Sequence, residues 1–395
     1  MSSTVRALAG CQIFDKFVVP DGWACVPLGE RIELAYGSGL REEDREPGEV
    51  DVFGSNGIVG RHTRALVPGP GLLVGRKGTV GAVHYTDRSF WPIDTVYYVV
   101  PRRGDSMRFL HHLLDYMPLK ALNAATGVPG LSRRDVYSLL GAFPPPREQA
   151  SVARVLDSVD TTIDGIREVS QRVDTLQNVV LEESFDRLAA KHCRLDAFLT
   201  DIRYGTSVAS SDNARGNPVL RIPNVVGDRL ALDDVAFVEL PAPDVDRLSL
   251  EDGDLLLVRT NGNRNYVGRS VVFRRLDNRI WLYASYLIRI RLNGDLLPDF
   301  VNTYLRLEPG RRQLLQRVTT SAGNHNINTN SIRLIRLPVP PRAEQERLVG
   351  LATAFRNRRD AITDMIDALY DLKKSLMHDF LTGRVRVGDR RTRLR

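Results

Sequence analysis

The sequence PPPREQ at residues 144–149 occurs again, with small changes, as PPRAEQ at residues 340–345. The two copies are 196 residues apart, and each precedes a long segment with apolar residues at alternating spacings of three and four. Such a stripe is typical of a coiled-coil helix. The sequence therefore predicts two copies of one unit, each consisting of a globular segment followed by a long helix.

The two apolar stripes keep the same register when the offset of 196 residues is applied. In the first segment the stripe consists of Val152, Val155, Val159, Thr162, Ile166, Val169, Val173, Leu176 and Val180. In the second segment it consists of Leu348, Leu351, Phe355, Arg358, Ile362, Met365, Leu369, Leu372 and Leu376. One such helix would fit a local bundle, but two helices in shared register are expected to pack on each other. We predict an antiparallel coiled coil of residues 148–186 and 344–382, with the apolar stripe residues as its seam.

The composition is that of a folded protein with room for two domains, since 43% of the 395 residues are hydrophobic and 26% are charged. No stretch is apolar enough to span a membrane, and residues 1–10 lack the apolar core of a signal peptide. Cys11, Cys25 and Cys193 are scattered, without a CxxC pair. We therefore expect a cytoplasmic protein in a reducing environment, without a disulfide framework or a zinc site.

The chain carries a formal net charge of +7 and has an isoelectric point of about 9.4. This charge favours a polyanionic partner over a membrane, because the sequence contains no basic amphipathic segment. Its 55 basic residues are nearly all arginine, whose guanidinium group suits bidentate contacts to phosphate and to guanine. A GC-rich genome would explain the excess of arginine over lysine equally well.

The predicted fold class is α+β, with two β-rich α/β globular units and a pseudo-twofold internal repeat. The first globular unit covers 1–143 and the second covers 190–339, and in both short apolar runs alternate with glycine and proline turns. Helical spacers cover 144–189 and 340–387, and a basic tail covers 388–395. The segment GLLVGRKGTVG at 71–81 corresponds to GDLLLVRTNGN at 253–263, although the two globular units share little residue identity.

No familiar catalytic arrangement occurs in the sequence. The segment GLLVGRKG at 71–78 is not a complete phosphate-binding loop, and GxSxG, HExxH and metal-spaced clusters are missing. His111 and His112 are adjacent, so they point to different helix faces and make a poor metal pair. The [DNS]PP[YFW] tetrad of adenine methyltransferases is missing too. We predict a non-enzymatic chain with no catalytic residue, no bound metal and no bound cofactor.

A resemblance to a known family is carried by the two connectors, their helices and the ending LKKSLMHDFLTGRVRV at 372–387. At these places the chain closely resembles the specificity subunit of type I restriction-modification systems. The resemblance covers nearly the whole chain, and three further segments are typical of one class of recognition domain: GSNGIVG at 54–60, GLLVGRKGTVG at 71–81 and FWPIDTVYYV at 90–99. Gly165 and the arginine-rich end at 390–395 depart from the family pattern.

The resemblance implies a DNA-binding subunit of a methyltransferase/endonuclease complex. Its two target-recognition domains would each read one half of an asymmetric, bipartite sequence in double-stranded DNA, and its helices would set the gap. Two methyltransferase (modification) subunits acting on N6 of adenine would dock on it, and restriction/translocase subunits could join them. S-adenosylmethionine, ATP and Mg would then be bound by the partner subunits. A helix over 148–186, about 58 Å long at 1.5 Å per residue, agrees with separated half-sites.

The candidate DNA contacts are basic and polar residues in matched turns of the two units, because arginine reads guanine and asparagine reads adenine in the major groove. In the first unit they are Arg61, His62, Arg64, Arg76, Lys77, Thr79, Arg133 and Arg134. In the second unit they are Arg259, Thr260, Asn261, Asn263, Arg264, Asn265, Asn324, His325, Asn326 and Asn328. Any one of them could instead be a solvated turn residue or a phosphate contact without sequence information.

Two other functions stay open at this point. One is a self-contained DNA-modifying enzyme with an unrecognised active site, and the other is a two-domain scaffold that binds nucleic acid or protein. The missing methyltransferase tetrad argues against the enzyme. The scarcity of exposed-looking aromatic residues on glycine-rich strands argues against a reader of single-stranded RNA.

Overall fold

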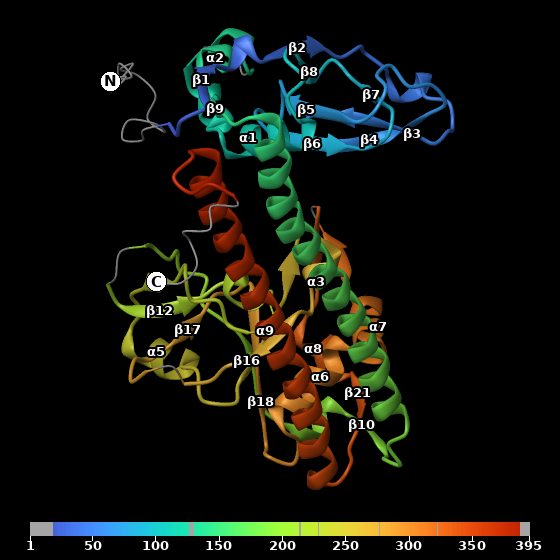
Figure 1. Cartoon of the computed structure of the whole chain (residues 1–395). Helices are drawn as coiled ribbons and strands as arrows, with labels where there is room; N and C mark the ends of the chain where they lie inside the picture. Colours follow the sequence, from blue (N-terminus) through green and yellow to red (C-terminus); the bar gives the residue numbers. More distant parts are fainter. Residues whose placement is uncertain are drawn as a thin grey trace. The chain divides into compact units, whose positions relative to one another are not determined.

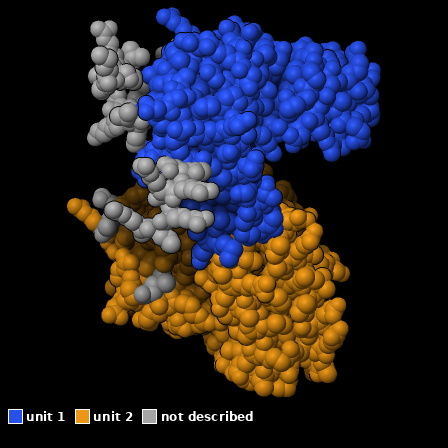
Figure 2. Space-filling view, viewed as in Figure 1, with its two compact units in different colours: residues 1–167, 364–395 blue, residues 168–363 orange. Residues whose placement is uncertain are grey.

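The computed structural model of the protein describes residues 19–125, 130–212, 215–227, 229–275, 277–321 and 323–387. Residues 1–18 (with Cys11), residues 126–129 and the predicted basic tail 388–395 lie outside these ranges. The chain divides into two compact units (Figure 2). Unit 1 comprises residues 1–167 and 364–395, and unit 2 comprises residues 168–363. Each unit therefore takes in one part of each long helix.

The two long helices are α3 (Pro146–Asp186) and α9 (Arg342–Leu381), which are green and red in Figure 1. Each begins directly behind its proline cluster, since proline keeps the preceding chain extended and is tolerated in the first helical turn. Glu148 and Glu344 lie in these first turns, near the positive end of the helix dipole. The predicted long helices are thus confirmed. Gly165 sits within α3 with open space around it, so packing does not require a glycine there.

The two helices run antiparallel, as the ion pairs between them show. In unit 1 the Lys373 ammonium nitrogen lies 2.7 Å from a carboxylate oxygen of Asp160. In unit 2 the Arg359 guanidinium lies 3.9 Å from a carboxylate oxygen of Asp174. A step forward from residue 160 to 174 on α3 therefore corresponds to an equal step back from 373 to 359 on α9. The predicted antiparallel pairing is confirmed.

The seam between the helices differs from the predicted one. Val152 and Leu348, at the two helix starts, are buried as predicted, with 1% and 0% exposure. The middle of the stripe is open to solvent instead, since Val169, Leu176 and Met365 are 50%, 60% and 54% exposed. The residues that form the interhelical ion pairs lie one position further on, so the contact face is rotated away from the stripe. Half-buried stripe residues are Val155, Val159, Ile166, Val173, Leu351, Phe355, Ile362 and Leu369.

The assignment of Val169, Leu176, Met365 and Leu372 to the seam is therefore wrong. An apolar stripe defines one face of a helix, but it does not say what packs on that face. Here the facing positions of the pair include charged residues, and their ion pairs take the place of part of the expected apolar contact.

Unit 1 contains a four-stranded sheet of order β2-β8-β5-β6 and a three-stranded sheet of order β4-β3-β7. A two-stranded sheet of β1 and β9 joins the beginning of the unit to the residues before α3. The strands are β1 (Ala24–Pro27), β2 (Ile32–Tyr36), β3 (Val50–Gly54), β4 (Gly57–His62), β5 (Gly71–Gly75), β6 (Val83–Thr86), β7 (Phe90–Pro92), β8 (Val96–Pro101) and β9 (Leu140–Phe143). Its short helices are α1 (Met107–Tyr116) and α2 (Arg133–Ser138).

Unit 2 repeats this plan with a four-stranded sheet of order β11-β18-β14-β16, a three-stranded sheet β13-β12-β17 and a pair β10-β21, and it adds a small sheet β15-β20-β19. The strands are β10 (His192–Arg194), β11 (Leu199–Tyr204), β12 (Asn217–Leu220), β13 (Ala236–Val238), β14 (Leu255–Val258), β15 (Thr260–Asn261), β16 (Ser270–Val272), β17 (Leu282–Tyr283), β18 (Leu287–Leu292), β19 (Thr319–Ser321), β20 (Asn324–Asn326) and β21 (Arg336–Pro338). The helices are α4 (Ile222–Val225), α5 (Ala242–Leu248), α6 (Pro298–Arg306), α7 (Glu308–Gln316) and α8 (Thr329–Arg333).

The main core of each unit includes strands of its four-stranded sheet, one short helix and parts of the long helices. In unit 1, Phe109 of α1 and Leu156 of α3 belong to one buried cluster. In unit 2, Phe300 of α6, Leu181 of α3 and Leu348 of α9 do the same. The α+β class and the internal repeat are thus confirmed. Among the described helices, none is long and apolar enough to cross a membrane.

The glutamine of the first connector ties α3 to the globular part of unit 1. The Gln149 amide nitrogen donates to the Pro144 carbonyl at 3.0 Å and to a carboxylate oxygen of Asp105 at 2.7 Å. Its amide oxygen accepts a hydrogen bond from the Ser106 N–H, just before α1, at 2.9 Å. Because Gln149 is fully buried, losing one of these bonds would leave a polar group unsatisfied.

The glutamine of the second connector makes the same clamp in unit 2. Gln345 donates to the Pro340 carbonyl at 3.1 Å and to the Asp295 carbonyl at 3.0 Å. It accepts from the Leu297 N–H, just before α6, at 2.8 Å. The repeated glutamine thus has the same structural role in both units, to tie the start of a long helix to the segment before a short one.

Candidate nucleic-acid interface

In unit 1 two arginines share one aromatic platform at the end of the four-stranded sheet. The guanidinium carbon of Arg76 lies 4.9 Å from the ring centre of Tyr36, and that of Arg133 lies 4.5 Å from the same centre. Tyr36, the last residue of β2, is 49% exposed. Stacking on an exposed ring contributes about 0.5–1 kcal/mol and fixes the plane of the guanidinium. Both side chains are thus held at the surface by contacts other than carboxylate ion pairs.

Unit 2 contains a similar pair of one arginine and one tyrosine. The guanidinium of Arg259 lies 4.4 Å from the ring centre of Tyr204, the last residue of β11. In both units the carbonyl of the stacked arginine accepts a backbone hydrogen bond from the segment before the next helix. Leu131 donates to Arg76 at 2.8 Å, and Ile327 donates to Arg259 at 2.9 Å. Arg76 and Arg259 therefore occupy equivalent places.

The loop after β5 carries further candidate contacts in unit 1. Lys77 and Thr79 are exposed there, and the Thr79 N–H donates to the Ser55 hydroxyl at 3.3 Å. This bond ties the loop to the turn between β3 and β4. Arg134 in α2 and Arg64 after β4 are exposed as well. The structure thus brings Arg76 and Arg133 together and leaves Arg64 on a different loop.

In unit 1 two residues of the candidate set lie on a strand and not in a turn. Arg61 and His62 are the last residues of β4. The His62 side chain is buried, with its Nδ1 accepting from the Glu46 N–H at 3.1 Å and its ring edge-on to Trp91. Arg61 is exposed and lies 3.3 Å from the Asp51 carboxylate. The expectation of a surface position is therefore wrong for His62, because its ring packs inside the unit.

The asparagines after β14 shape their own loop. The side-chain oxygen of Asn261 accepts from the Asn263 N–H at 2.8 Å, and that of Asn263 accepts from the Asn265 N–H at 2.9 Å. Such Asx turns are a common reason for dense asparagine in loops. Exposed Arg264 donates to the Leu315 carbonyl at 2.9 Å. Each amide oxygen can still accept a second hydrogen bond, so the turns do not exclude a base contact.

The second asparagine cluster lies on β20 and at the start of α8, and here too local hydrogen bonds use part of each side chain. Asn326 donates to the Asn324 carbonyl at 3.1 Å, and Asn328 caps α8 by accepting from the Ser331 N–H at 2.8 Å. His325 lies opposite Thr320, with Nδ1 and the hydroxyl 3.1 Å apart. Strand β20 pairs with β15, so Thr260 lies beside Asn326. The two candidate segments of unit 2 thus form one surface.

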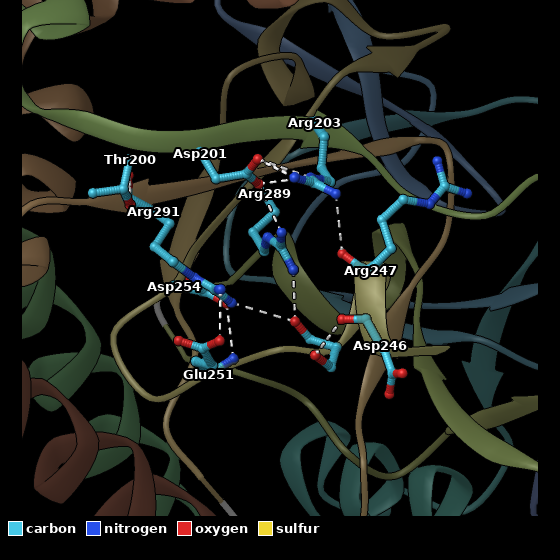
Figure 3. A network of polar contacts seen from close by, with 10 residues as sticks. Thr200, Asp201, Arg203, Asp246, Arg247, Glu251, Asp254, Arg289 and Arg291 are labelled. Atoms are coloured by element: carbon cyan, nitrogen blue, oxygen red, sulfur yellow. Dashed lines mark hydrogen bonds and ion pairs between the residues drawn. The ribbon is translucent and has the colours of Figure 1, made fainter. Parts of the chain in front are cut away.

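A network of arginines and acids in unit 2 was not predicted (Figure 3). Arg289, only 2% exposed, donates to Asp201 at 2.7 Å and to the Ser249 carbonyl at 2.6 Å. Arg291 on the same strand pairs with Asp254 at 2.7 Å. Burial opposes ionisation of Asp201, but hydrogen bonds from Arg203 and Arg289 outweigh it, so the pKa of this carboxyl lies below its ordinary value. These arginines hold β11, β14 and β18 together and are not free for DNA.

In unit 1 a buried polar cluster joins α1 to the long helices. His112 Nε2 lies 2.9 Å from an Asp157 carboxylate oxygen, and Asp160 follows one helical turn later with its partner Lys373. Single ligand atoms of His112, Asp157 and Asp160 lie within 4.8 Å of one another, a grouping that spacing within one helix could not reveal. Burial lowers the pKa of His112, so its ring is neutral near pH 7. The ammonium of Lys373 already supplies positive charge here, and the expected lack of a bound metal stays a prediction.

Comparison with known proteins shows what the chain is similar to. Residues 20–175 match the model of the type I restriction modification DNA specificity domain. The specificity subunit of the EcoKI enzyme from Escherichia coli K12 is 28% identical over 248 residues, covering 58% of this chain and 53% of that protein. The specificity subunit of the StySPI enzyme from Salmonella potsdam is 24% identical over 280 residues, covering 67% of this chain and 60% of that protein. Residues 20–175 thus match this specificity domain, and the chain is similar to type I specificity subunits over more than half of its length.

Solved structures of type I specificity subunits share this fold. The specificity subunit from M. genitalium superimposes with a TM-score of 0.54 at 14% identity, over 91% of this chain and 96% of that one. A chain from a structural study of type I complex assembly and conformational transition gives a TM-score of 0.60 at 16% identity, over 94% and 100%. The specificity-subunit fold thus covers nearly the whole chain. By sequence, the chain spans 53% to 60% of the length of the two curated family members.

Proposed function

We propose that this chain is the non-catalytic DNA-specificity subunit of a type I restriction-modification complex. Each unit would read one half of a bipartite, asymmetric target in double-stranded DNA. The observation that carries this proposal is the repeated cluster of an arginine stacked on a tyrosine, Arg76 on Tyr36 and Arg259 on Tyr204. The two clusters occupy equivalent places, while the loops beside them differ in sequence.

The difference between these loops supports two unlike half-sites. Unit 1 surrounds its cluster with cationic and small side chains such as Lys77 and Thr79, whereas unit 2 surrounds it with asparagines. Cationic side chains bind guanine O6 and N7 in the major groove, and the amide of asparagine binds adenine. The formal net charge of +7 adds a sequence-independent attraction to the phosphate backbone.

The exposed apolar stripe of the long helices supports docking of partner subunits. Leu176 and Val180 on α3 are 60% and 40% exposed, and Met365 and Leu372 on α9 are 54% and 48% exposed. Apolar side chains repeated along one helix face are unusual at a free surface and typical of protein interfaces. Two methyltransferase subunits would bind here and supply adenine N6 methylation, with restriction/translocase subunits joining them. S-adenosylmethionine, ATP and Mg would be bound by these partners.

The test replaces one reader at a time in the intact complex. The globular part of unit 2, residues 190–339, is exchanged for the matching part of a relative with another target, and cellular DNA is sequenced for methylated adenine. We expect one half of the methylated target to change, while the other half and the spacing stay the same. A change of both halves after a single exchange would contradict the two-reader proposal.

The same preparation tests the enzyme alternative. The purified chain, supplied with S-adenosylmethionine, ATP and Mg but no partner subunit, should neither methylate nor cleave DNA. If the homogeneous protein modifies DNA, and a point mutation in this chain abolishes that activity, the chain is an enzyme in its own right.

A further inference from the structure

The hairpin of β3 and β4 in unit 1 exposes two consecutive apolar side chains near its tip. Ile58 and Val59 are 58% and 40% exposed. Val52 pairs with Gly60 and Phe53 pairs with Ile58, so Val59 is an extra residue of β4. Such a β-bulge interrupts the alternation of side chains between the two faces of a strand and can re-aim a side chain. The bulge therefore accounts for two neighbouring apolar residues at the surface.

The tip of this hairpin is held in place by contacts on both sides. On one side, His84 Nε2 of β6 lies 3.1 Å from the carbonyl oxygen of Ser55, which is in the turn between β3 and β4. On the other side, the Arg45 guanidinium donates to the Val59 carbonyl at 2.7 Å. The Val59 side chain lies against Gly54, where a Cβ would come within 2.9 Å of it. Ile58, the more exposed of the two, is thus presented on a braced frame.

The tip also adjoins the loop that carries candidate DNA contacts. The Ser55 hydroxyl accepts a hydrogen bond from the Thr79 N–H at 3.3 Å. Gly78, which has a positive φ of 74°, passes so close that a Cβ there would lie 3.0 Å from the same hydroxyl oxygen. This loop begins with Arg76, which stacks on the platform described above. Ile58 therefore belongs to the same end of unit 1 as the candidate reading arginine.

Unit 2 has a different connection at the equivalent place. Its three-stranded sheet β13-β12-β17 repeats the order and strand directions of β4-β3-β7. In unit 1 only residues 55–56 join β3 to β4, whereas residues 221–235, which include α4, join β12 to β13 in unit 2. The apolar tip is therefore not part of the repeated frame. Such a difference suits a residue that helps to read one half-site.

We propose that Ile58 is a specificity-determining residue of unit 1 that contacts the C5 methyl group of a thymine. This inference rests on the proposed function, in which unit 1 reads one half of a DNA target. The thymine methyl group is the one apolar group that the base edges present in the major groove. Contact with it would remove the exposed isoleucine and the methyl group from water together. Cytosine, which carries no methyl group at this position, offers no such partner.

The experiment removes single methyl groups from the DNA. The target of the intact complex is read by sequencing methylated adenine, and exchange of residues 190–339 shows which half unit 1 reads. In that half each thymine is replaced in turn by deoxyuridine, which lacks only the C5 methyl group. At one position the wild-type complex should bind about fourfold more weakly, because one methyl contact is lost.

The variant Ile58→Ala shows whether this side chain makes the contact. It should bind the thymine duplex about fourfold more weakly than the wild type and should no longer distinguish thymine from deoxyuridine. The matched control is Val100→Ala, because Val100 is 41% exposed and lies towards the other end of β8 from Val96, which pairs with Gly75. This variant should keep the full preference for thymine. Circular dichroism melting verifies that both variants are folded.

Three results would overturn the assignment of Ile58. They are a half-site without thymine, an Ile58→Ala complex that keeps the preference for thymine, and an equal loss for thymine and deoxyuridine duplexes. The last result would indicate an apolar wedge or a backbone contact. In each case the complex would still distinguish its target from random duplex, so the proposed function would stand. A complex that does not make this distinction would contradict the proposed function and this inference together.

Discussion

The two units share one fold plan but differ in what they place against the long helices. Their equivalence is fixed by the glutamine clamps, which hold Ser106 before α1 and Leu297 before α6 in the same way. On the helices, Leu156 of unit 1 corresponds to Ala352 of unit 2, and Asp160 corresponds to Arg356. In unit 1 Leu156 fills this place and Asp160 is paired with Lys373. In unit 2 Ala352 and Arg356 instead line a pocket of about 960 Å³.

The residues that face these positions from neighbouring helices differ between the units as well. Lys373, which pairs with Asp160 in unit 1, corresponds to Gln177 in unit 2, and His112 corresponds to Thr303. The shared backbone therefore accepts either a closed ion-pair cluster or an open pocket at one place. The comparison teaches that the two units share the backbone frame but differ in the side chains that they place against the long helices at these positions.

The largest expected effect on stability comes from exchanging the side chains at the equivalent positions 156 and 352. Leu156→Ala should lower the free energy of unfolding by about 3 kcal/mol, because Leu156 is fully buried and the cavity would stay. Ala352→Leu should change it by less than about 1 kcal/mol, since the pocket offers room. Urea unfolding followed by circular dichroism measures both. Equal losses in the two variants would show that unit 2 is as tightly packed here as unit 1.

A smaller loss of stability is expected when the positive charge of Lys373, which pairs with Asp160 in unit 1, is removed. Lys373→Met should lower the free energy of unfolding by about 2 kcal/mol, because the Lys373 side chain is only 12% exposed and its loss leaves Asp160 without this partner. The matched change Gln177→Met should stay within about 0.5 kcal/mol, because the buried Gln177 oxygen has no hydrogen-bond partner among the described residues. Unfolding by urea again gives the values. An unchanged stability of the lysine variant would mean that the ion pair contributes nothing.

Lowering the pH should reduce the stability of unit 1 through His111. The corresponding residue of unit 2 is Asn302. Burial lowers the pKa of His111 from 6.5 to about 3, with His112, Lys373 and Arg108 acting in the same direction and Asp160 in the opposite one. Between these values the unfolded chain binds the proton more tightly, so stability falls as the pH drops below 6.5 and levels off near 3.

The measurement compares melting of the wild type and His111→Asn at pH 7 and pH 5. The wild type should lose on the order of 1 kcal/mol more than the variant over this interval. An identical loss in both proteins would show that His111 does not contribute to acid sensitivity.

The smallest effects concern the aromatic platforms. Tyr36→Leu and Tyr204→Leu should each weaken DNA binding by about 0.5–1 kcal/mol, because a stacked guanidinium loses its fixed plane. Each variant should affect discrimination in one half of the target only, as measured by competition with altered duplexes. Tyr370→Leu is the control, because Arg167 stacks on this tyrosine at 5.2 Å on the long helices. A loss in both half-sites from one variant would argue against separate readers.

The repeat, the long helices and their antiparallel direction were predictable, because proline clusters and heptad spacing are local signals. The contact face was not, since Val169 and Leu176 are apolar and yet point to solvent while Asp174 faces α9. The pattern could not distinguish a face that packs within the chain from a face left for a partner. Only the interhelical ion pairs settle the rotation of each helix.

The candidate site was predicted in part. Arg76, Arg133 and Arg259 were identified from their turns, but their platforms Tyr36 and Tyr204 lie on strands far away in sequence, where no spacing connects them. The pocket of unit 2 was invisible for the same reason, because its lining residues come from several separate segments. The glutamine clamp carried a usable signal, since its residue recurs in both connectors.

The second of these clamps has a consequence for the exchange of one globular segment for another. Gln345 hydrogen-bonds to the segment before α6 only through main-chain groups, the Asp295 carbonyl and the Leu297 N–H. Every amino acid has a main-chain carbonyl and every one except proline has a main-chain N–H, so these two bonds place little demand on the side chains at positions 295 and 297. At the second connector a foreign globular segment could therefore be joined to α9 and keep these two bonds, whereas the first connector also requires an acceptor side chain at the position of Asp105.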